Sequence, residues 1–260
     1  MRARLQNVSG RVLPNGVLDV FVQVALMQAT YMAYRLVRGW IDDPQGAAIA
    51  FQNGRDIIGI EQSLGIFFEP RIQELLGPTS LIADASSWVY LNAQVTVTLA
   101  ALTYLYLRHN RSFYFVRNMF VVAWAIALLG YALFPTAPPR FFPEWGFTDS
   151  VADFTGVDPS ADDGASALFN PYAAVPSMHV AFALMIAVPL AKLAKTRPVR
   201  WFWTGYPLLV TFVIVMTANH FVVDAVLGAA TAACAATAAV WLARARPVWG
   251  FNTAPARATA

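Results

Sequence analysis

The chain has 260 residues, of which 58% are hydrophobic and 13% are charged, with a formal net charge of +3. A soluble domain carries about 25% charged residues, so this composition, together with a mean hydropathy of +0.51, excludes an ordinary soluble protein and indicates an integral membrane protein. The single cysteine excludes an internal disulfide and a cysteine metal cluster.

Six apolar segments are long enough to cross a membrane as helices, which takes about 20 residues each. In chain order the predicted spans cover residues 17–37, 86–107, 116–134, 176–194, 201–217 and 219–242. We therefore predict an all-α fold, a six-transmembrane helix bundle. Residues 1–16 form its N-terminus, residues 17–243 its one membrane domain, and residues 244–260 a disordered tail.

The connections between these segments differ sharply in charge. The two ends of the chain and the connections near residues 108–117 and 192–200 hold thirteen Lys or Arg and no acid. The two long loops, residues 38–85 and 135–175, hold four Arg and thirteen Asp or Glu. Because Lys and Arg mark the cytoplasmic side, both termini are predicted to be cytoplasmic and both long loops extracytoplasmic. This topology beside anionic lipid explains the basic pI, so no nucleic-acid partner is expected.

The first long loop contains a segment, residues 46–77, whose apolar residues recur at near-helical spacing. Its apolar stretches are too short to span the membrane, so we predict one or two interfacial helices. We expect Pro70 to break or kink the helix there. The second long loop begins with four prolines within residues 135–143 and continues with an acidic, turn-rich stretch. Asp162 and Asp163 in that stretch are interpreted as solvated, and no metal site is predicted.

Two of the three histidines lie where apolar segments begin on the predicted extracytoplasmic side. Pro176 and Ser177 are typical of a helix start, which places His179 in a first turn whose N–H groups favour an anion such as phosphate. His220 begins the sixth segment. Asp224 follows four residues later on the same helix face and can hydrogen-bond the ring. That contact would orient the imidazole and make its other nitrogen a better nucleophile or base.

Arg140 is predicted at the same surface, so His179, His220, Asp224 and Arg140 converge from three separate segments. An ionisable residue at the membrane edge indicates function. Phosphoryl transfer suits these residue types: His220 attacks phosphorus, His179 protonates the leaving oxygen, and Arg140 holds phosphate oxygens. This chemistry needs neither a metal nor a cofactor. His109, in the segment RHNR, is predicted on the cytoplasmic side and outside the site.

These residues resemble the type 2 phosphatidic acid phosphatase superfamily. Residues 176–179 read PSMH, where the family's second motif is Pro-Ser-Gly-His, and HFVVD at 220–224 matches the His-x-x-x-Asp of its third motif. The resemblance implies His220 as nucleophile, Asp224 as its partner, His179 as general acid, and a six-span catalytic domain with an outward-facing site. The segments PTAPPR, NPYAAVPSMH and TANHFVVDAVLG look most like the inositolphosphotransferase-like branch, which includes enzymes similar to inositol phosphorylceramide synthase.

The sequence departs from the family pattern at its phosphate-binding cations. The Ser-Arg pair of the third motif falls at Val213 and Ile214, and Leu133 stands where the first motif has Lys. We expect Arg140 to take part of that role. Met178, which replaces the motif glycine, is expected to reshape the substrate pocket. The further candidate phosphate ligands are Ser177, Asn219 and Tyr172.

The resemblance implies a metal-independent lipid phosphatase or head-group phosphotransferase acting on a lipid phosphate or phospholipid, in a bacterial plasma membrane. It leaves the lipid tail, the acceptor and the oligomeric state open. A proton-coupled transporter that uses His179, His220 and Asp224 as a relay is an alternative, and so is a non-catalytic lipid-binding protein. The placement of the polar groups at one membrane face rather than at the midplane favours the enzyme.

Overall fold

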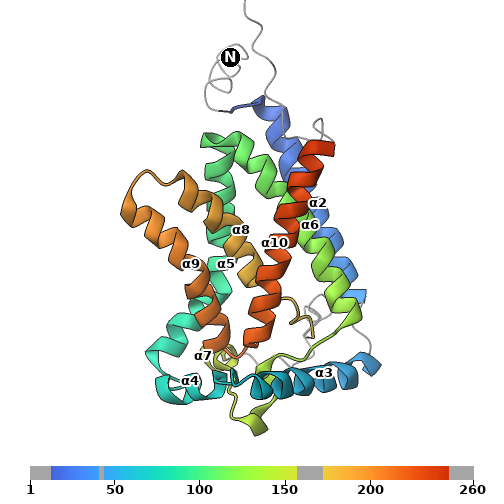
Figure 1. Ribbon diagram of the computed structural model, residues 1–260, viewed down its shortest axis with the longest axis vertical. Coiled ribbons are helices and arrows are strands. Elements are labelled where there is room, and N and C mark those ends of the chain that lie inside the picture. Colours follow the sequence, from blue (N-terminus) through green and yellow to red (C-terminus); the bar gives the residue numbers. More distant parts are fainter. Residues whose placement is uncertain (1–12, 41–43, 157–171, 246–260) are drawn as a thin grey trace, which may run out of the picture.

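The computed structural model describes residues 13–40, 44–156 and 172–245 (Figure 1). Within these ranges the regular structure is helical, apart from one isolated bridge between Thr136 and Ala173, which confirms the all-α prediction. The C-terminal tail beyond residue 245, most of the N-terminal segment and the acidic stretch at 157–171 lie outside the described residues.

Six long helices run side by side, and each overlaps one of the six predicted segments. They are α2 (Gly16–Trp40), α5 (Leu81–Arg108), α6 (Asn110–Leu133), α8 (Met178–Leu193), α9 (Arg197–Met216) and α10 (Val222–Ala245). The other helices lie at one end of this bundle (Figure 1). They are α3 (Pro44–Ser63), α4 (Glu69–Leu76), α7 (Ser150–Thr155) and the 3₁₀ turns Pro139–Phe141 and Pro143–Trp145.

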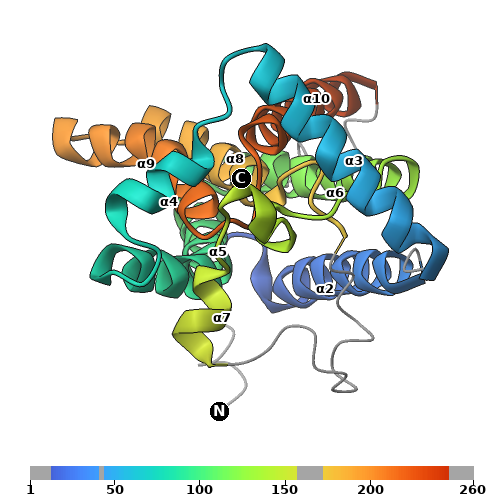
Figure 2. The same cartoon turned by 90° about the horizontal axis from the view of Figure 1, so that it is seen from below.

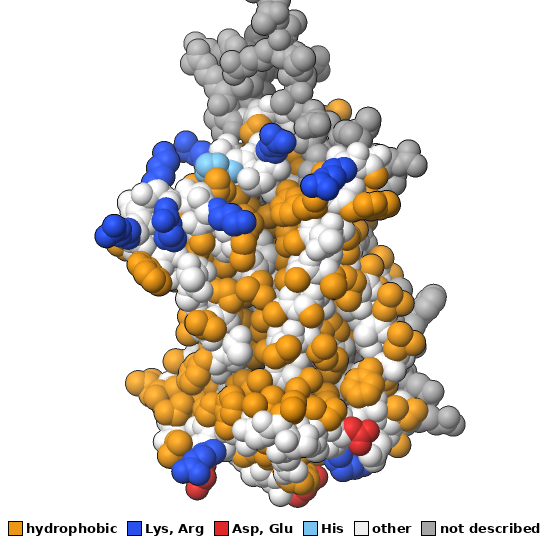
Figure 3. Space-filling view, viewed as in Figure 1, with side chains coloured by type: hydrophobic (Ala, Val, Ile, Leu, Met, Phe, Trp, Pro, Cys, Tyr) orange, Lys and Arg blue, Asp and Glu red, His pale blue; other side chains and the backbone are white. Residues whose placement is uncertain are grey.

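Four helices of the described chain are long and apolar enough to cross a membrane: α6, α9, α10 and the Gly16–Leu36 part of α2. Large apolar side chains are exposed on them, with Leu18 78% and Leu208 74% accessible. Figure 3 shows apolar side chains over the middle of the molecule. Soluble monomers rarely expose such a surface, so these helices indicate an integral membrane protein.

Charged side chains gather at the two ends of this apolar surface (Figure 3). Lys and Arg lie at the end where α8 turns into α9 and α5 into α6. Asp and Glu appear at the opposite end, around α3 and α4, together with a few Arg. The charge difference between the loops therefore corresponds to two opposite ends of one molecule.

The helix α3 lies across the end of the bundle, and α4 lies beside the end of α9 (Figure 2). The expected interruption between two helices is present, but it falls at residues 64–68, between the end of α3 and the start of α4. Pro70 occupies the first turn of α4, where its missing N–H breaks no helical hydrogen bond. The proline therefore starts the second helix and does not end the first.

A small apolar core joins α3 to the loops around it. Gly54 allows the close approach, because a Cβ at this position would lie 2.5 Å from the ring of Phe142. The backbone N–H of Ala137 donates to the carbonyl of Ala50 at 3.0 Å. The buried members of this core are Ala50, Ile57, Ile58, Ala137, Phe142, Phe147, Val175, Ala218 and Phe221. Because Ala218 and Phe221 flank His220 in sequence, the segments at this end of the bundle support the turn that carries this histidine.

Candidate active site

The site lies where α8 and α10 begin next to each other. The backbone N–H of Ser177 donates to the carbonyl of Asp224 at 3.1 Å. One turn further along α10, a Cβ on Gly228 would lie 2.3 Å from the carbonyl oxygen of Ser177. Only glycine permits so close an approach of two backbones. The first turn of α8, which carries His179, and the first turn of α10, which follows His220, are thereby held in contact.

His220 and Asp224 make the contact that their spacing predicts. The ring Nδ1 of His220 lies 3.2 Å from Oδ2 of Asp224, and both residues are buried. The same oxygen accepts the backbone N–H of Phe221 at 3.0 Å, which fixes the carboxyl group, while Oδ1 is buried without a hydrogen-bond partner. The carboxyl group therefore sets the ring orientation and is placed to stabilise positive charge on the imidazole.

The second histidine, His179, faces the first from α8. Its ring lies 5.5 Å from that of His220, centroid to centroid, in an edge-to-face arrangement. On its other side the ring stacks on Tyr90 of α5 at 4.6 Å. Sequence reasoning missed Tyr90, because nothing in its apolar segment marks it as part of a site.

A tight turn between α9 and α10 connects His220 to Arg140. Ala218 has a left-handed backbone conformation, with φ of 51°, and its carbonyl accepts the N–H of Arg140 at 2.8 Å. The Arg140 guanidinium donates to the side-chain oxygen of Asn219, next to the histidine. It also pairs with Asp149, Nε to Oδ2, at 3.4 Å. The structure thus brings Arg140 and Asn219 together beside the histidine pair.

The two other candidate phosphate ligands lie in different surroundings. Ser177 occupies the N-cap position of α8, but its side chain does not cap the helix, and its buried hydroxyl has no hydrogen-bond partner. A buried hydroxyl left unpaired costs about 1–3 kcal/mol, so it is suited to a ligand. Tyr172 packs its ring against Phe51 and Phe141, at 6.2 Å from each, and Phe141 follows Arg140 in sequence.

The comparison with protein families decides the relationship of this chain. A model described as the PAP2 superfamily matches residues 55–238, a range that holds both histidines, Asp224 and Arg140. The chain belongs to the PAP2 superfamily. Members of this superfamily are phosphatases and phosphotransferases, which indicates an enzyme of lipid phosphate chemistry. No curated protein and no solved structure matches the chain.

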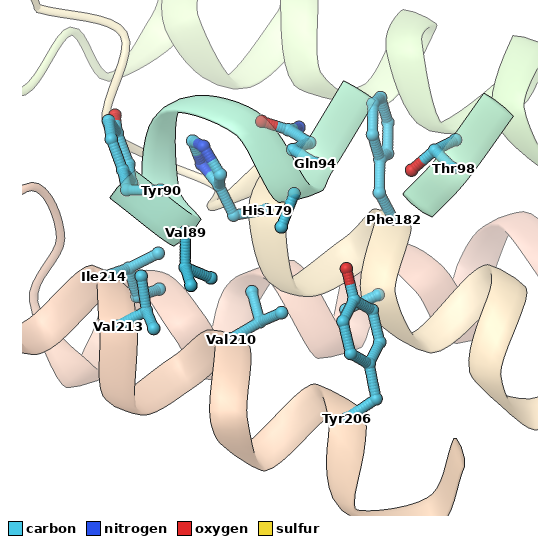
Figure 4. Close-up of a pocket in the computed structure, with 12 residues that line it drawn as sticks. Val89, Tyr90, Gln94, Thr98, His179, Phe182, Tyr206, Val210, Val213 and Ile214 are labelled. Carbon is cyan, nitrogen blue, oxygen red and sulfur yellow. The ribbon is translucent and has the colours of Figure 1, made fainter. Parts of the chain in front are cut away.

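An apolar pocket extends from His179 between α5, α8 and α9, with Tyr206 further along it (Figure 4). Its cavity volume is about 20 Å³, so the pocket is narrow. Val213 and Ile214, which replace the family's Ser-Arg pair, belong to its lining. In this PAP2 chain, the two positions where the family has Ser and Arg therefore contribute apolar side chains to the wall of the pocket. The lining residues are Val89, Tyr90, Ala93, Gln94, Thr98, His179, Phe182, Ala183, Tyr206, Val210, Val213 and Ile214.

Met178, which stands at the motif glycine, packs away from the pocket beside His179. Its side chain is 6% exposed and packs in the main hydrophobic core, and it is not part of the lining of the pocket beside His179. In the first turn of a helix, neighbouring side chains point in different directions. Met178 therefore faces the core, while His179 faces the site.

Two buried glutamates lie behind the PAP2 site, and sequence reasoning missed their role. Glu61 of α3 accepts the N–H of Val223 at 2.8 Å, and Glu69 of α4 accepts the N–H of Val222 at 3.1 Å. Both side chains are fully buried. Burial, followed by the neighbouring Glu69, raises the pKa of Glu61 to about 9. One signal was present in the sequence, because Glu61 follows the apolar Ile57 by four residues and so shares its helix face.

The remaining groups lie elsewhere. His109 lies beyond the other end of α5, 19 residues from Tyr90 or about 28 Å along a helix, and its ring contacts Tyr104. Among the residues that the structure describes, no group of three or more His, Cys, Asp or Glu is placed to hold a metal ion.

Proposed function

We propose that this PAP2 chain is a membrane enzyme that transfers a phosphoryl group from a lipid phosphoester through a phosphohistidine at His220. The observation that carries the proposal is the pair of facing histidines, one of which is bonded to a buried carboxyl group. With their centroids 5.5 Å apart, the two rings are close enough for one phosphoryl group to contact both, as an in-line displacement requires.

The first step forms the phosphohistidine. Nε2 of His220 attacks phosphorus while the bond from phosphorus to the ester oxygen breaks. His179 gives its proton to the departing oxygen. Asp224 stabilises the positive charge on the His220 ring, and Arg140, Asn219 and the Ser177 hydroxyl hold the oxygens of the transferring group.

The second step returns the enzyme to its starting state. Water or a second alcohol attacks phosphorus, its proton passes to His179, and the bond to Nε2 breaks. Water gives a lipid phosphatase, whereas an alcohol gives a head-group phosphotransferase of the inositolphosphotransferase-like kind. Both outcomes use the same residues, and neither step requires a metal.

The pocket beside His179 supports a substrate with an apolar chain. Its walls are mostly apolar side chains from α5, α8 and α9, and α9 exposes Leu208 and Leu209 on its surface. A lipid phosphate could place its phosphate at the histidines and its chain against these helices. A water-soluble phosphoester would gain nothing from such walls.

For the topology, we propose six spans, in which α5 and α8 cross the membrane beside α2, α6, α9 and α10, and α3 and α4 lie in the outer interface. The site then faces the extracytoplasmic side of a bacterial plasma membrane, and both termini are cytoplasmic. Support comes from the separation of the charges and the positive-inside rule.

A substrate panel tests the proposal. Purified protein in lipid nanodiscs is incubated with lipid phosphates and with inositol phospholipids, with and without a lipid alcohol as acceptor, and free phosphate and lipid products are measured together. We expect turnover that vanadate inhibits and that a metal chelator leaves unchanged. Proton-coupled uptake with no turnover of any phosphoester would support a transporter instead, and lipid binding with no turnover would support a binding protein.

A further inference from the structure

The first turn of α10 immediately follows His220, and its backbone N–H groups are bound by carboxyl groups from three different elements. The N–H of Phe221 donates to Asp224 of α10 itself, that of Val222 to Glu69 of α4, and that of Val223 to Glu61 of α3. N-terminal helical N–H groups have no partner within the helix. Here α3 and α4 supply the partners that a local N-cap would otherwise provide.

The two glutamates are also in contact with each other. Both side chains are fully buried, and Glu69 lies close enough to raise the pKa of Glu61. The second oxygen of each group, Oε2, is buried and has no hydrogen-bond partner among the described residues. Burial and a neighbouring like charge both disfavour ionisation, so the two carboxyl groups do not readily carry a charge at the same time. One proton between them removes the repulsion and satisfies both oxygens, while each group still accepts an N–H from α10.

We propose that Glu61 and Glu69 are positioning residues that share one proton and hold the first turn of α10, and thereby fix His220 and Asp224 in their working geometry. The catalytic part of this proposal rests on the proposed function, but the structural part does not. Negative charge close to a helix N-terminus is favourable, so one ionised member of the pair stabilises the same turn electrostatically.

This arrangement has a pH dependence with a definite sign. The groups that face Glu61 are Glu69 from α4 and Asp224 from α10, and both raise its pKa, which burial raises most. The folded protein therefore binds a proton that the unfolded chain releases above its ordinary pKa of 4.5. The associated stability is fully present below that value and is lost as the pH rises through about 9. Above it, two ionised carboxylates lie behind His220.

The test compares Glu61→Ala, Glu61→Gln and Glu69→Ala with the wild-type chain, with Glu74→Ala as control. Glu74 is an exposed acid on the same helix as Glu69. Hydrogen exchange of the segment 219–226 is followed by mass spectrometry in nanodiscs, and kcat and KM are measured with the substrate found in the panel. The amide of Glu61→Gln can still accept the N–H of Val223, whereas the alanine cannot.

We expect both alanine variants to exchange the segment 219–226 at least about tenfold faster and to lose at least about tenfold in kcat, with KM within about threefold. Glu61→Gln and Glu74→Ala should remain within about threefold of wild type in all three quantities. Wild-type exchange and kcat in Glu61→Ala would overturn the positioning role. Equal losses in Glu61→Gln and Glu61→Ala would overturn it as well.

The shared proton has a separate readout, which also serves if Glu61→Ala does not fold. The thermal unfolding temperature of the wild-type chain should fall between pH 6 and pH 10 more steeply than that of Glu61→Gln, which has no proton to lose at this position. Parallel curves for the two proteins would overturn the shared proton. A wild-type chain with no turnover on any lipid phosphoester would contradict the proposed function, while hydrogen exchange and unfolding would still decide the role of the pair.

Discussion

Asp224 contributes to the site through both its position and its charge. Its Oδ2 contacts the His220 ring and the backbone N–H of Phe221, so the same atom fixes the carboxyl group and the imidazole. An asparagine of the same size can still accept from these groups, but it cannot neutralise an imidazolium. The charge and the placement of this residue can therefore be separated by one substitution.

Asp224→Asn should lower kcat by roughly 100-fold to 10,000-fold with little change in KM, because the lost charge is needed mainly while the transition state forms. The measurement is steady-state turnover, with the thermal unfolding temperature as a check that the variant is folded. A folded variant with kcat within about threefold of wild type would show that the carboxylate charge has no part in the reaction.

Part of the site could be predicted from the sequence alone. His179, His220 and Asp224 were found because helix starts and an i, i+4 spacing are local properties of the chain. Glu61 and Tyr90 were not found as site residues, because their partners are about 160 and 90 residues away in sequence. Met178 was expected to reshape the pocket because it replaces a motif glycine, but the direction of a side chain from a first helical turn depends on how the helix packs.

At the scale of the elements, the contact between α8 and α10 decides whether the two histidines meet. Gly228 has no side chain at the point where the two backbones touch. The long helices themselves could be predicted, because each overlaps one predominantly apolar segment. The position of α3 across the end of the bundle could not, because it depends on Gly54 meeting Phe142 and on Glu61 reaching Val223.

Gly228→Ala should reduce turnover by at least about 30-fold and lower the thermal unfolding temperature. Its Cβ would lie 2.3 Å from the carbonyl oxygen of Ser177, so the helices must separate by about 1 Å, and such misplacement costs on the order of 100-fold in rate. Gly205→Ala in α9 is the matched control, because no atom lies within 4 Å of its added Cβ. Equal activity in the two variants would exclude close helix contact as a requirement.

At the scale of the whole molecule, the charge distribution indicates which side of the membrane the site faces. The end that holds α3 and α4 also holds the histidine pair, through the contacts of Glu61 and Glu69 with α10. Lys and Arg gather at the other end. If positive charge remains in the cytoplasm, the site opens on the extracytoplasmic side.

Single-cysteine labelling tests this orientation in intact cells. In a Cys234→Ser background, which removes the only native cysteine, Glu74→Cys on α4 should react with a membrane-impermeant maleimide. Lys195→Cys, in the turn between α8 and α9, should react only after the cells are permeabilised. The reverse pattern would place the site in the cytoplasm.

The most direct test of phosphoryl transfer through His220 is the initial rate of phosphate release or head-group transfer by the purified His220→Ala variant. His109→Ala serves as control, because that histidine lies at the opposite end of α5. We predict that His220→Ala loses at least about 1,000-fold in rate, since a nucleophile cannot be replaced by its neighbours, and that His109→Ala keeps the wild-type rate. Full activity in a folded His220→Ala protein would contradict the account.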